Sequence, residues 1–283
     1  MRVALVLLGF MACNTPVVHD ADKAAKPADP LVLSDVSAQI SALVPTVAHV
    51  SWSSSGPGKA FVEYGLDGSF GQISPTTEGA TEVRQVLLGL KAGRSYSWRA
   101  VMLDDDGDRV QSEPQTLQIA APPPGLPHFE IAVDDTEQQR AGGFFLMNVM
   151  TLGESSVAAI IDRDGDLVWW FEGLADRQIM SVDLGRDGES VRWLWTNYVD
   201  RSQDGGGIAR LGIDGMSLTE TEATRGHHHF QELADGQLAW LCWSATTDVE
   251  VEGETLPLVW DRVCESGAPV FDFLVDWETP WYT

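Results

Sequence analysis

Positive charge is scarce in this sequence. Lysine and arginine together number 18, against 42 aspartate and glutamate residues, which gives a formal net charge of -24 at pH 7. Nucleic-acid binding depends on lysine and arginine clustered against phosphates, so this balance argues against nucleic acid as a partner. The acidic residues form no single long run, and this distribution indicates a solvated protein surface.

Cysteine is also rare, with three residues in the chain. Beyond Cys13, only Cys242 and Cys264 remain, so these two can form at most one bridge. In an oxidising periplasmic or extracellular setting they could pair as a disulfide. The alternative is that both are small core residues with free thiols.

Long apolar runs are missing. The opening "MRVALVLLGFMAC" has one positive charge, at Arg2, followed by a short apolar run and a small residue before Cys13. The run is too short to cross a bilayer as a helix, but its three-part layout is that of a secretory signal.

The end of this leader, "GFMAC", resembles a bacterial lipobox, although Phe10 stands where leucine is commoner. Residues 1–13 are therefore interpreted as a lipoprotein signal peptide, and cleavage would leave Cys13 carrying several acyl chains that anchor it in a membrane. Residues 14–30 would follow as a flexible tether. We expect a lipid-anchored location in a bacterial cell envelope, facing the periplasm or the exterior. A plain signal peptide with an incidental cysteine is the alternative.

Residues 31–121 show short alternating segments separated by turn residues, such as "AHVSWSS" and "KAFVEYG". Seven strands in this length are typical of an immunoglobulin-like sandwich. Trp52, Tyr64 and the phrase "LKAGRSYSWRA", with Tyr96 as the corner tyrosine, resemble a fibronectin type III domain. Such domains are usually spacers or binding modules. The acidic "DDDGD" at 104–108 is interpreted as a hairpin turn, with a cation site as the alternative.

The proline-rich "APPPGLPH" marks a boundary, and residues 122–139 are interpreted as a linker and entry strand. From residue 140 to 283, Asp-Gly turns recur at Asp164, Asp187, Asp214 and Asp235, each between alternating apolar segments. No helical periodicity competes over any long stretch. The pattern predicts hairpins and, with its clustered tryptophans, blades of a β-propeller. A sandwich with long hairpins is the alternative, and either arrangement makes the whole chain all-β.

One of these turns, "DRDGD" at 162–166, has acidic residues at alternate positions, as the start of a calcium loop does. It lacks the bidentate glutamate at the expected spacing, so we interpret it as a hairpin turn.

The phrases "VAAIIDRDGDLVWWFE" and "GHHHFQELADGQLAWL" together resemble the arylsulfate sulfotransferase family over residues 140–283 at low identity. His227 and His228 fall on the two histidines of the family, and Asp235 and Gly236 fall on its Asn-Gly turn. His229 stands where that family has an acidic residue.

The resemblance implies transfer of a sulfuryl group from a phenolic sulfate donor to a phenolic acceptor through a sulfo-histidine intermediate, without a cofactor. His228 is the first candidate for a catalytic histidine and His227 the second, since imidazole serves as nucleophile, base and acid near neutral pH. Arg225 and His229 are candidates for binding the sulfate oxygens.

Residues 140–283 supply about three propeller blades at roughly 40 to 45 residues per blade, fewer than a closed propeller needs. We therefore expect a C-terminally truncated member of the family, inactive as it stands because segments of the site are missing, including the one that the resemblance implies carries the nucleophilic histidine. The alternatives are a finished short protein that lost the chemistry, and a non-catalytic envelope lipoprotein that binds a glycan or a protein.

The three histidines could also have a non-catalytic role, either structural or as metal ligands. They could be partly buried structural residues at a strand entry. For a zinc site, strand alternation would place His227 and His229 on one face and His228 on the other. Two ligands on one face are too few, so we predict no metal.

Overall fold

A computed structural model of the chain describes residues 30–122, 124–126, 128–132, 143–150, 156–197, 205–251, 253–265 and 268–272. Throughout these residues the fold is all-β, without a helix, and every strand ladder is antiparallel. The predicted all-β class is thereby confirmed. The described strands all belong to a compact unit that begins at Leu31. The leader with Cys13 lies outside the described residues, and no membrane-spanning helix occurs within them.

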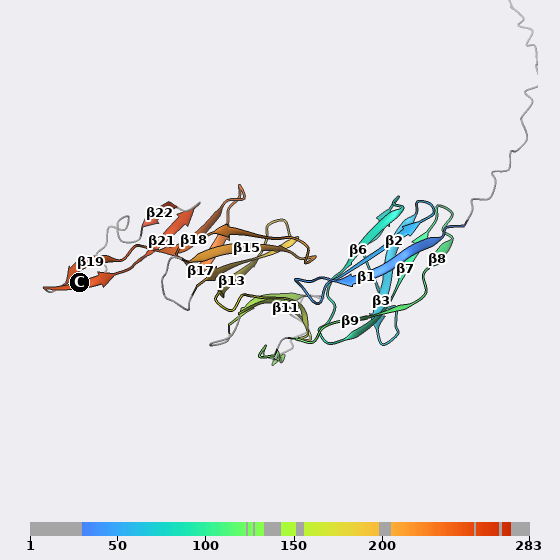
Figure 1. Cartoon of the computed structure of the whole chain (residues 1–283), viewed down its shortest axis with the longest axis horizontal. Helices are drawn as coiled ribbons and strands as arrows, with labels where there is room; N and C mark the ends of the chain where they lie inside the picture. The colour runs from blue at the N-terminus through green and yellow to red at the C-terminus, as the bar shows by residue number, and fades with distance from the viewer. Residues whose placement is uncertain are drawn as a thin grey trace, which may run out of the picture. The chain divides into compact units, whose positions relative to one another are not determined.

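Two sheets are built from the first half of the unit (Figure 1). One has the order β1 (Leu33–Ile40), β2 (Ala48–Ser54), β6 (Glu82–Leu87). The other is β4 (Gln72–Ile73), β3 (Lys59–Leu66), β7 (Ser95–Leu103), β8 (Arg109–Gln111), with β5 (Thr77–Glu78) also on β3 and β9 (Gln115–Gln118) also on β7.

The two sheets enclose one apolar core. Burial alternates along β2 and β7, as expected for strands with one face inward. Trp52 and Trp98, which are 2% and 1% exposed, are the largest members of this core. Tyr96 is also buried, and its hydroxyl accepts a hydrogen bond of 2.9 Å from the backbone N–H of Lys91. This bond ties the start of β7 to the loop that precedes it.

Four further sheets follow. The first is β10 (Phe144–Val149), β11 (Val157–Asp162), β12 (Leu167–Glu172). The second is β13 (Gln178–Leu184), β14 (Ser190–Thr196), β15 (Gly206–Gly212), β16 (Leu218–Glu222). The third is β17 (Gly226–Glu232), β18 (Leu238–Trp243), β21 (Asp261–Glu265), β22 (Ala268–Asp272), and the last pairs β19 (Thr247–Val251) with β20 (Glu254–Leu258).

The Asp-Gly turns lie where the sequence predicts hairpins. They join β11 to β12, β13 to β14, β15 to β16 and β17 to β18, and each of these strand pairs is hydrogen-bonded. The glycines have positive φ angles, of 84° at Gly165, 70° at Gly188, 70° at Gly215 and 85° at Gly236. Glycine adopts this backbone region without steric cost, which is why it stands there.

The turn between β1 and β2 belongs to the core of the second half. Val44 and Val47 are fully buried in a cluster with Trp169 and Trp193. The Ser41 hydroxyl donates a buried hydrogen bond of 2.9 Å to the carbonyl of Gly215. The sheets of the two halves therefore share apolar packing at this turn.

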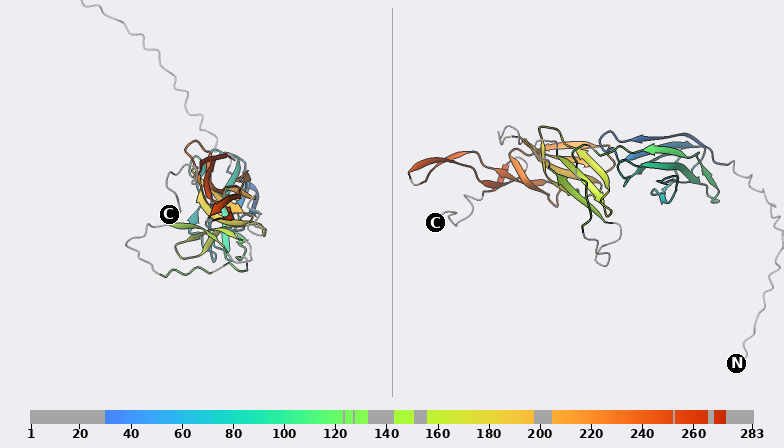
Figure 2. Two further views of the ribbon diagram at one scale, coloured as in Figure 1. Left: turned by 90° about the vertical axis from the view of Figure 1, so that its left-hand side faces the viewer. Right: turned by 90° about the horizontal axis from the view of Figure 1, so that it is seen from below.

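No sheet closes on itself within the described ranges. The β19–β20 hairpin is an excursion between β18 and β21, and Figure 2 shows it extending beyond the four-stranded sheet from which it emerges.

Candidate functional site

The three histidines occupy a bulge in β17. Gly226 pairs with Cys242 and Phe230 pairs with Trp240, so four steps along β17 face two steps along β18. The two extra residues interrupt the strand period. His228 has a φ of 57°, in the left-handed region that few residues other than glycine adopt.

This bulge overturns the predicted alternation. Because regular pleating is lost, His227 and His228 do not point to opposite faces, and their Nδ1 atoms lie 2.7 Å apart. The two rings meet edge to face with centroids 4.9 Å apart. Two nitrogens at this distance form a hydrogen bond only if one carries the proton and the other offers a lone pair.

His227 is the buried member of the pair, with its side chain 3% exposed. Its ring stacks on Trp243, with centroids 4.6 Å apart and planes 16° apart. Asp261 Oδ1 lies 3.2 Å from Nε2 of His227, but without hydrogen-bond geometry, so this buried nitrogen has no hydrogen-bond partner among the described residues. The ring is thus fixed by packing and placed beside a carboxylate.

Burial lowers the pKa of His227 below its ordinary value, because the charged imidazolium loses hydration inside the protein. The Asp261 carboxylate acts against this change and neighbouring His228 adds to it. His227 is therefore neutral at neutral pH. His228 and His229 are exposed, so their rings are accessible from solvent.

The other two predicted residues flank the pair. His229 lies on the solvent side and its ring contacts Phe230 at a centroid distance of 6.4 Å. Arg225 precedes the bulge with a φ of 58°, and its carbonyl accepts a hydrogen bond of 3.0 Å from the N–H of Trp243.

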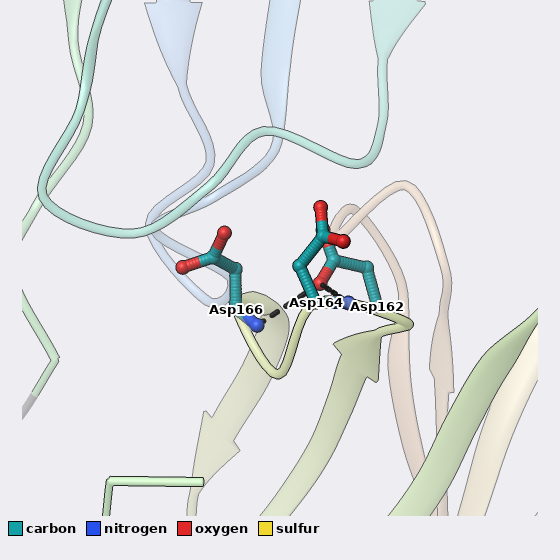
Figure 3. Close-up of side chains that lie close together, drawn as sticks. All are labelled: Asp162, Asp164 and Asp166. Carbon is teal, nitrogen blue, oxygen red and sulfur yellow. Dashed lines mark hydrogen bonds between the residues drawn. The ribbon is translucent and has the colours of Figure 1, made fainter. Parts of the chain in front are cut away.

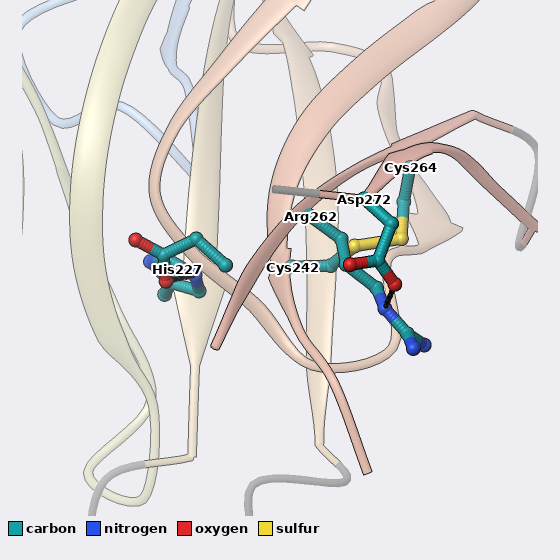
Figure 4. The surroundings of a disulfide bond; sticks show 6 residues. His227, Cys242, Arg262, Cys264 and Asp272 are labelled. Atoms are coloured by element: carbon teal, nitrogen blue, oxygen red, sulfur yellow. Dashed lines mark hydrogen bonds and ion pairs between the residues drawn. A yellow bond between two sulfur atoms is a disulfide. The ribbon is translucent and has the colours of Figure 1, made fainter. Parts of the chain in front are cut away.

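Cys242 and Cys264 are joined by a disulfide between β18 and β21, with their Cα atoms 6.0 Å apart. In register Cys242 faces Arg262 and Cys264 faces Trp240. Figure 4 shows the bridge beside Arg262 and Asp272, whose side chains form an ion pair of 2.6 Å. The bridge therefore braces the strand that carries Asp261.

The acidic turn at 162–166 holds an ammonium group of the protein itself. Lys91 Nζ lies 3.0 Å from Asp162, 3.1 Å from Asp164 and 2.6 Å from Asp166. Asp162 Oδ1 also accepts the backbone N–H groups of Asp164 and Asp166, which closes the turn (Figure 3). Burial acts to lower the pKa of Lys91, but the three carboxylates outweigh it and raise the pKa above its ordinary value.

These three aspartates are close enough to share a cation. The ammonium of Lys91 occupies the position between them and offsets part of their charge, so the cluster is a hairpin turn with an internal counter-ion. The reading of "DRDGD" as a hairpin turn agrees with the β11–β12 pairing around it.

Two cavities lie elsewhere on the described surface. One of about 1240 Å³ follows the outer face of β1, β2 and β6 and is bordered by residues 214–216. A smaller one, of about 250 Å³, lies over β14 to β16 and is lined by Phe171, Trp193 and Trp195.

Sequence reasoning named the histidines but missed Trp243, Asp261 and Lys91. Trp240 and Trp243 lie in the same alternating strand, and the alternation does not indicate which of the two rings contacts a histidine. Asp261 and Lys91 reach their partners across 34 and 71 to 75 residues of sequence, and no local motif marks such pairs.

Comparison with known proteins identifies no family. No family model matches the chain and no curated protein matches it. Two solved structures are similar in part, namely an uncharacterized protein from Listeria monocytogenes EGD-e (TM-score 0.22, 12% identity) and the cycloalternan-forming enzyme from Listeria monocytogenes in complex with pentasaccharide substrate (TM-score 0.21, 11% identity). Each comparison covers 71% of this chain and 20% of the other, so this chain spans about a fifth of those proteins' length. Similarity at this level carries no conclusion about fold or function.

Proposed function

We propose that the protein is an arylsulfotransferase-like protein of the bacterial cell envelope, in which His227 and His228 form one wall of a sulfuryl-transfer site. The single observation that carries the proposal is the contact between the two Nδ1 atoms, 2.7 Å apart. The family resemblance of the two sequence phrases supplies the reaction class.

The fold gives two kinds of support to this proposal. The buried Trp52 and the Tyr96 hydroxyl bonded to the Lys91 backbone match the pattern of a fibronectin type III sandwich. The sheet of β13 to β16 is a four-stranded antiparallel meander in chain order, which is the form of a propeller blade.

The environment of the pair assigns a role to each ring. The carboxylate of Asp261 beside Nε2 of His227 favours the tautomer that holds the proton on Nε2. Nδ1 of His227 then accepts a hydrogen bond from Nδ1 of His228. A neutral His228 in that tautomer keeps its lone pair on Nε2, and this exposed nitrogen can take up or return a proton.

The reaction implied by the resemblance has two halves. A histidine nitrogen attacks the sulfur of an aryl sulfate, the bond from sulfur to the aryl oxygen breaks, and the departing oxygen takes a proton. A phenol oxygen then attacks the same sulfur, the N–S bond breaks and the phenol proton passes to a base. We assign the proton transfers to His228, positioned by neutral His227, and binding of sulfate oxygens to Arg225 and His229.

The test is sulfuryl transfer from 4-nitrophenyl sulfate to phenol by the entire gene product, measured as phenol-dependent release of 4-nitrophenol. We expect His228→Gln to lower kcat by about 100-fold or more, the usual contribution of one acid–base group. His229→Gln is the matched control and should mainly raise KM. Absence of transfer, or an unchanged kcat in His228→Gln, would overturn the proposal.

The lipid anchor at Cys13 is part of the same proposal. Wild-type protein should partition into detergent after expression in a bacterium, and Cys13→Ser should leave it in the aqueous fraction. Equal partitioning of both would remove the anchor from the proposal.

A binding module is the second candidate, and the cavity along β1, β2 and β6 favours it. Its walls include the polar side chains of Ser37, Gln39, Ser51 and Arg84. These donors and acceptors suit a polar chain such as a glycan. Affinity for bacterial glycans that survives His228→Gln but not Arg84→Ala would support this function.

A further inference from the structure

The smaller cavity is built by residues that the sulfuryl-transfer proposal does not use. Its floor and walls come from β12 to β16 and from the connection after β12, whereas the histidine pair lies on β17. We refer to it as the Trp193 pocket. It shares no lining residue with the histidine site, so what it binds can be argued separately.

Small residues in β15 create the space. Ala209 pairs with Trp193 on one side and Glu220 on the other, so a methyl group lies between two much larger side chains. In the next row Gly207 pairs with Trp195, and a Cβ at Gly207 would come within 2.7 Å of the Trp195 ring nitrogen. The Trp195 ring therefore covers Gly207, and the cavity opens above Ala209.

The walls are aromatic and apolar. Phe171 stacks on Trp193 with centroids 4.6 Å apart and planes 30° apart, which gives the cavity a flat side. Leu174 and Leu218 stand at the rim and are 56% and 42% exposed. Large apolar side chains exposed around an apolar cavity are stabilised when a ring covers them.

Among the described residues that line this cavity, Arg177 and Glu220 have charged side chains, and the two form an ion pair. Arg177 Nη1 lies 2.6 Å from Glu220 Oε1, and the guanidinium carbon lies 3.8 Å from the centre of the Trp195 ring. Glu220 takes one of the five guanidinium N–H groups, and the other described contact of the group is the face of Trp195. Among the residues that the structure describes, the other donors of Arg177 and the second oxygen of Glu220 have no hydrogen-bond partner, so they are available to a ligand.

These features define the chemistry of the occupant. A volume of about 250 Å³ holds a molecule of one or two rings. The pair of Arg177 and Glu220 is neutral overall, so an anionic substituent would be repelled by Glu220 and a cationic one by Arg177. A hydroxyl suits both partners, because it can donate to the carboxylate and accept from the guanidinium, whereas a ring N–H can donate to the carboxylate alone.

We propose that the Trp193 pocket binds a small neutral aromatic molecule with one hydroxyl or N–H group, its ring against Phe171 and Trp193 and its polar group at Arg177 and Glu220. A sugar ring fits less well, because the walls offer few hydrogen bonds for its many hydroxyls. This site does not depend on sulfuryl transfer, and its test can fail or succeed separately.

The experiment is a titration of the full chain with p-cresol and with indole, followed by tryptophan fluorescence and by saturation-transfer NMR. Saturable binding of both is expected, with 4-methylbenzoate, 4-methylbenzylammonium and cyclohexanol at least about tenfold weaker, the loss from one mismatched charged group or a lost aromatic contact. Equal binding of cyclohexanol, or no saturable binding of p-cresol, would overturn the proposal.

Substitutions test whether p-cresol binds in the Trp193 pocket. Ala209→Val fills the floor and should weaken p-cresol binding about tenfold or more, and Arg177→Met should weaken p-cresol but not toluene. Arg210→Met is the matched control, because Arg210 lies next to Ala209 in β15 but pairs with Asp187 outside the pocket. If Ala209→Val lowers the unfolding midpoint, the exposed-rim variant Leu174→Ala replaces it. Unchanged p-cresol affinity in Arg177→Met and in a pocket-filling or rim variant would place the binding elsewhere and overturn the site.

Discussion

The ammonium of Lys91 lies 2.6 Å from the carboxylate of Asp166, a residue 75 positions further along the chain. The same ammonium contacts Asp162 and Asp164, so one lysine is shared by three carboxylates that lie within 4.8 Å of one another and offsets part of their charge. Next to this contact the N–H of Ala92 donates to the carbonyl of Leu167. The loop before β7 is thereby fastened to the β11–β12 hairpin.

Replacing Lys91 with methionine should lower the free energy of unfolding by about 1.5 to 3 kcal/mol, the range for hydrogen bonds to charged groups. The variant leaves three carboxylates without a counter-ion, so calcium should restore part of the loss and raise the unfolding midpoint. Urea unfolding with and without calcium measures both effects.

The control for this variant is Lys59→Met, which removes a 3.5 Å pair with Glu78 between two exposed side chains. It should change stability by less than about 0.5 kcal/mol and should not respond to calcium. Equal loss in the two variants would contradict a special role for Lys91.

A second prediction concerns pH. The pKa of His227 is lowered on folding, chiefly by burial, so between the folded pKa and the unfolded value of about 6.5 the unfolded chain binds more protons. Stability from this group is complete above about pH 6.5 and is lost as the pH falls, by up to about 1.4 kcal/mol for each pKa unit of separation. Urea unfolding at pH 7.5 and 5.5 should show a smaller decrease in His227→Gln than in wild type.

His229→Gln provides the matched comparison, because that ring is exposed. Between pH 7.5 and 5.5 this variant should lose as much free energy of unfolding as the wild type does. If His227→Gln and wild type lose the same stability, the buried imidazole does not titrate in the way the structure indicates.

The backbone at His228 gives a third prediction. With a φ of 57°, this position suits glycine and opposes a β-branched side chain. His228→Val should therefore be less stable than His228→Gly by about 1 to 3 kcal/mol. Chemical unfolding of the two variants is the measurement, and a valine variant as stable as the glycine variant would show that the bulge can relax.

The disulfide between Cys242 and Cys264 gives a fourth prediction. Cys242 and Cys264 are 22 residues apart, and closing a loop of this size restricts the unfolded chain by about 3 kcal/mol. Cys242→Ser with Cys264→Ser should lower the unfolding free energy by about that amount, and a reducing agent should destabilise wild type but leave the double variant unchanged. A wild type insensitive to reduction under unfolding conditions would contradict this.

Much of the strand pattern could be predicted from the sequence, because it depends on short-range signals. The Asp-Gly pairs at Asp164, Asp187, Asp214 and Asp235 fix hairpins through glycine φ angles, and alternation identifies β2 and β7. The interior positions of Trp52 and Tyr96 also follow from that alternation.

The geometry of the histidines could not be predicted in this way. Alternation assigns faces only while two strands advance in step, and the pairing of Gly226 with Cys242 and of Phe230 with Trp240 breaks that step. The bulge depends on how β17 and β18 are paired, and neither strand's own residues indicate it. For the same reason the Trp193 pocket, which depends on Ala209 lying between Trp193 and Glu220, has no signature in any single segment.

The packing of the β1–β2 turn affects what happens when the chain is cut between its two halves. Since Val44 and Val47 are fully buried beside Trp169 and Trp193, a cut at the proline-rich stretch near residue 122 would leave apolar surface exposed on both pieces. We therefore expect each half to be less stable alone than in the intact chain. Heating should melt residues 31–272 in one transition, and a thermostable sandwich released by proteolysis is not expected.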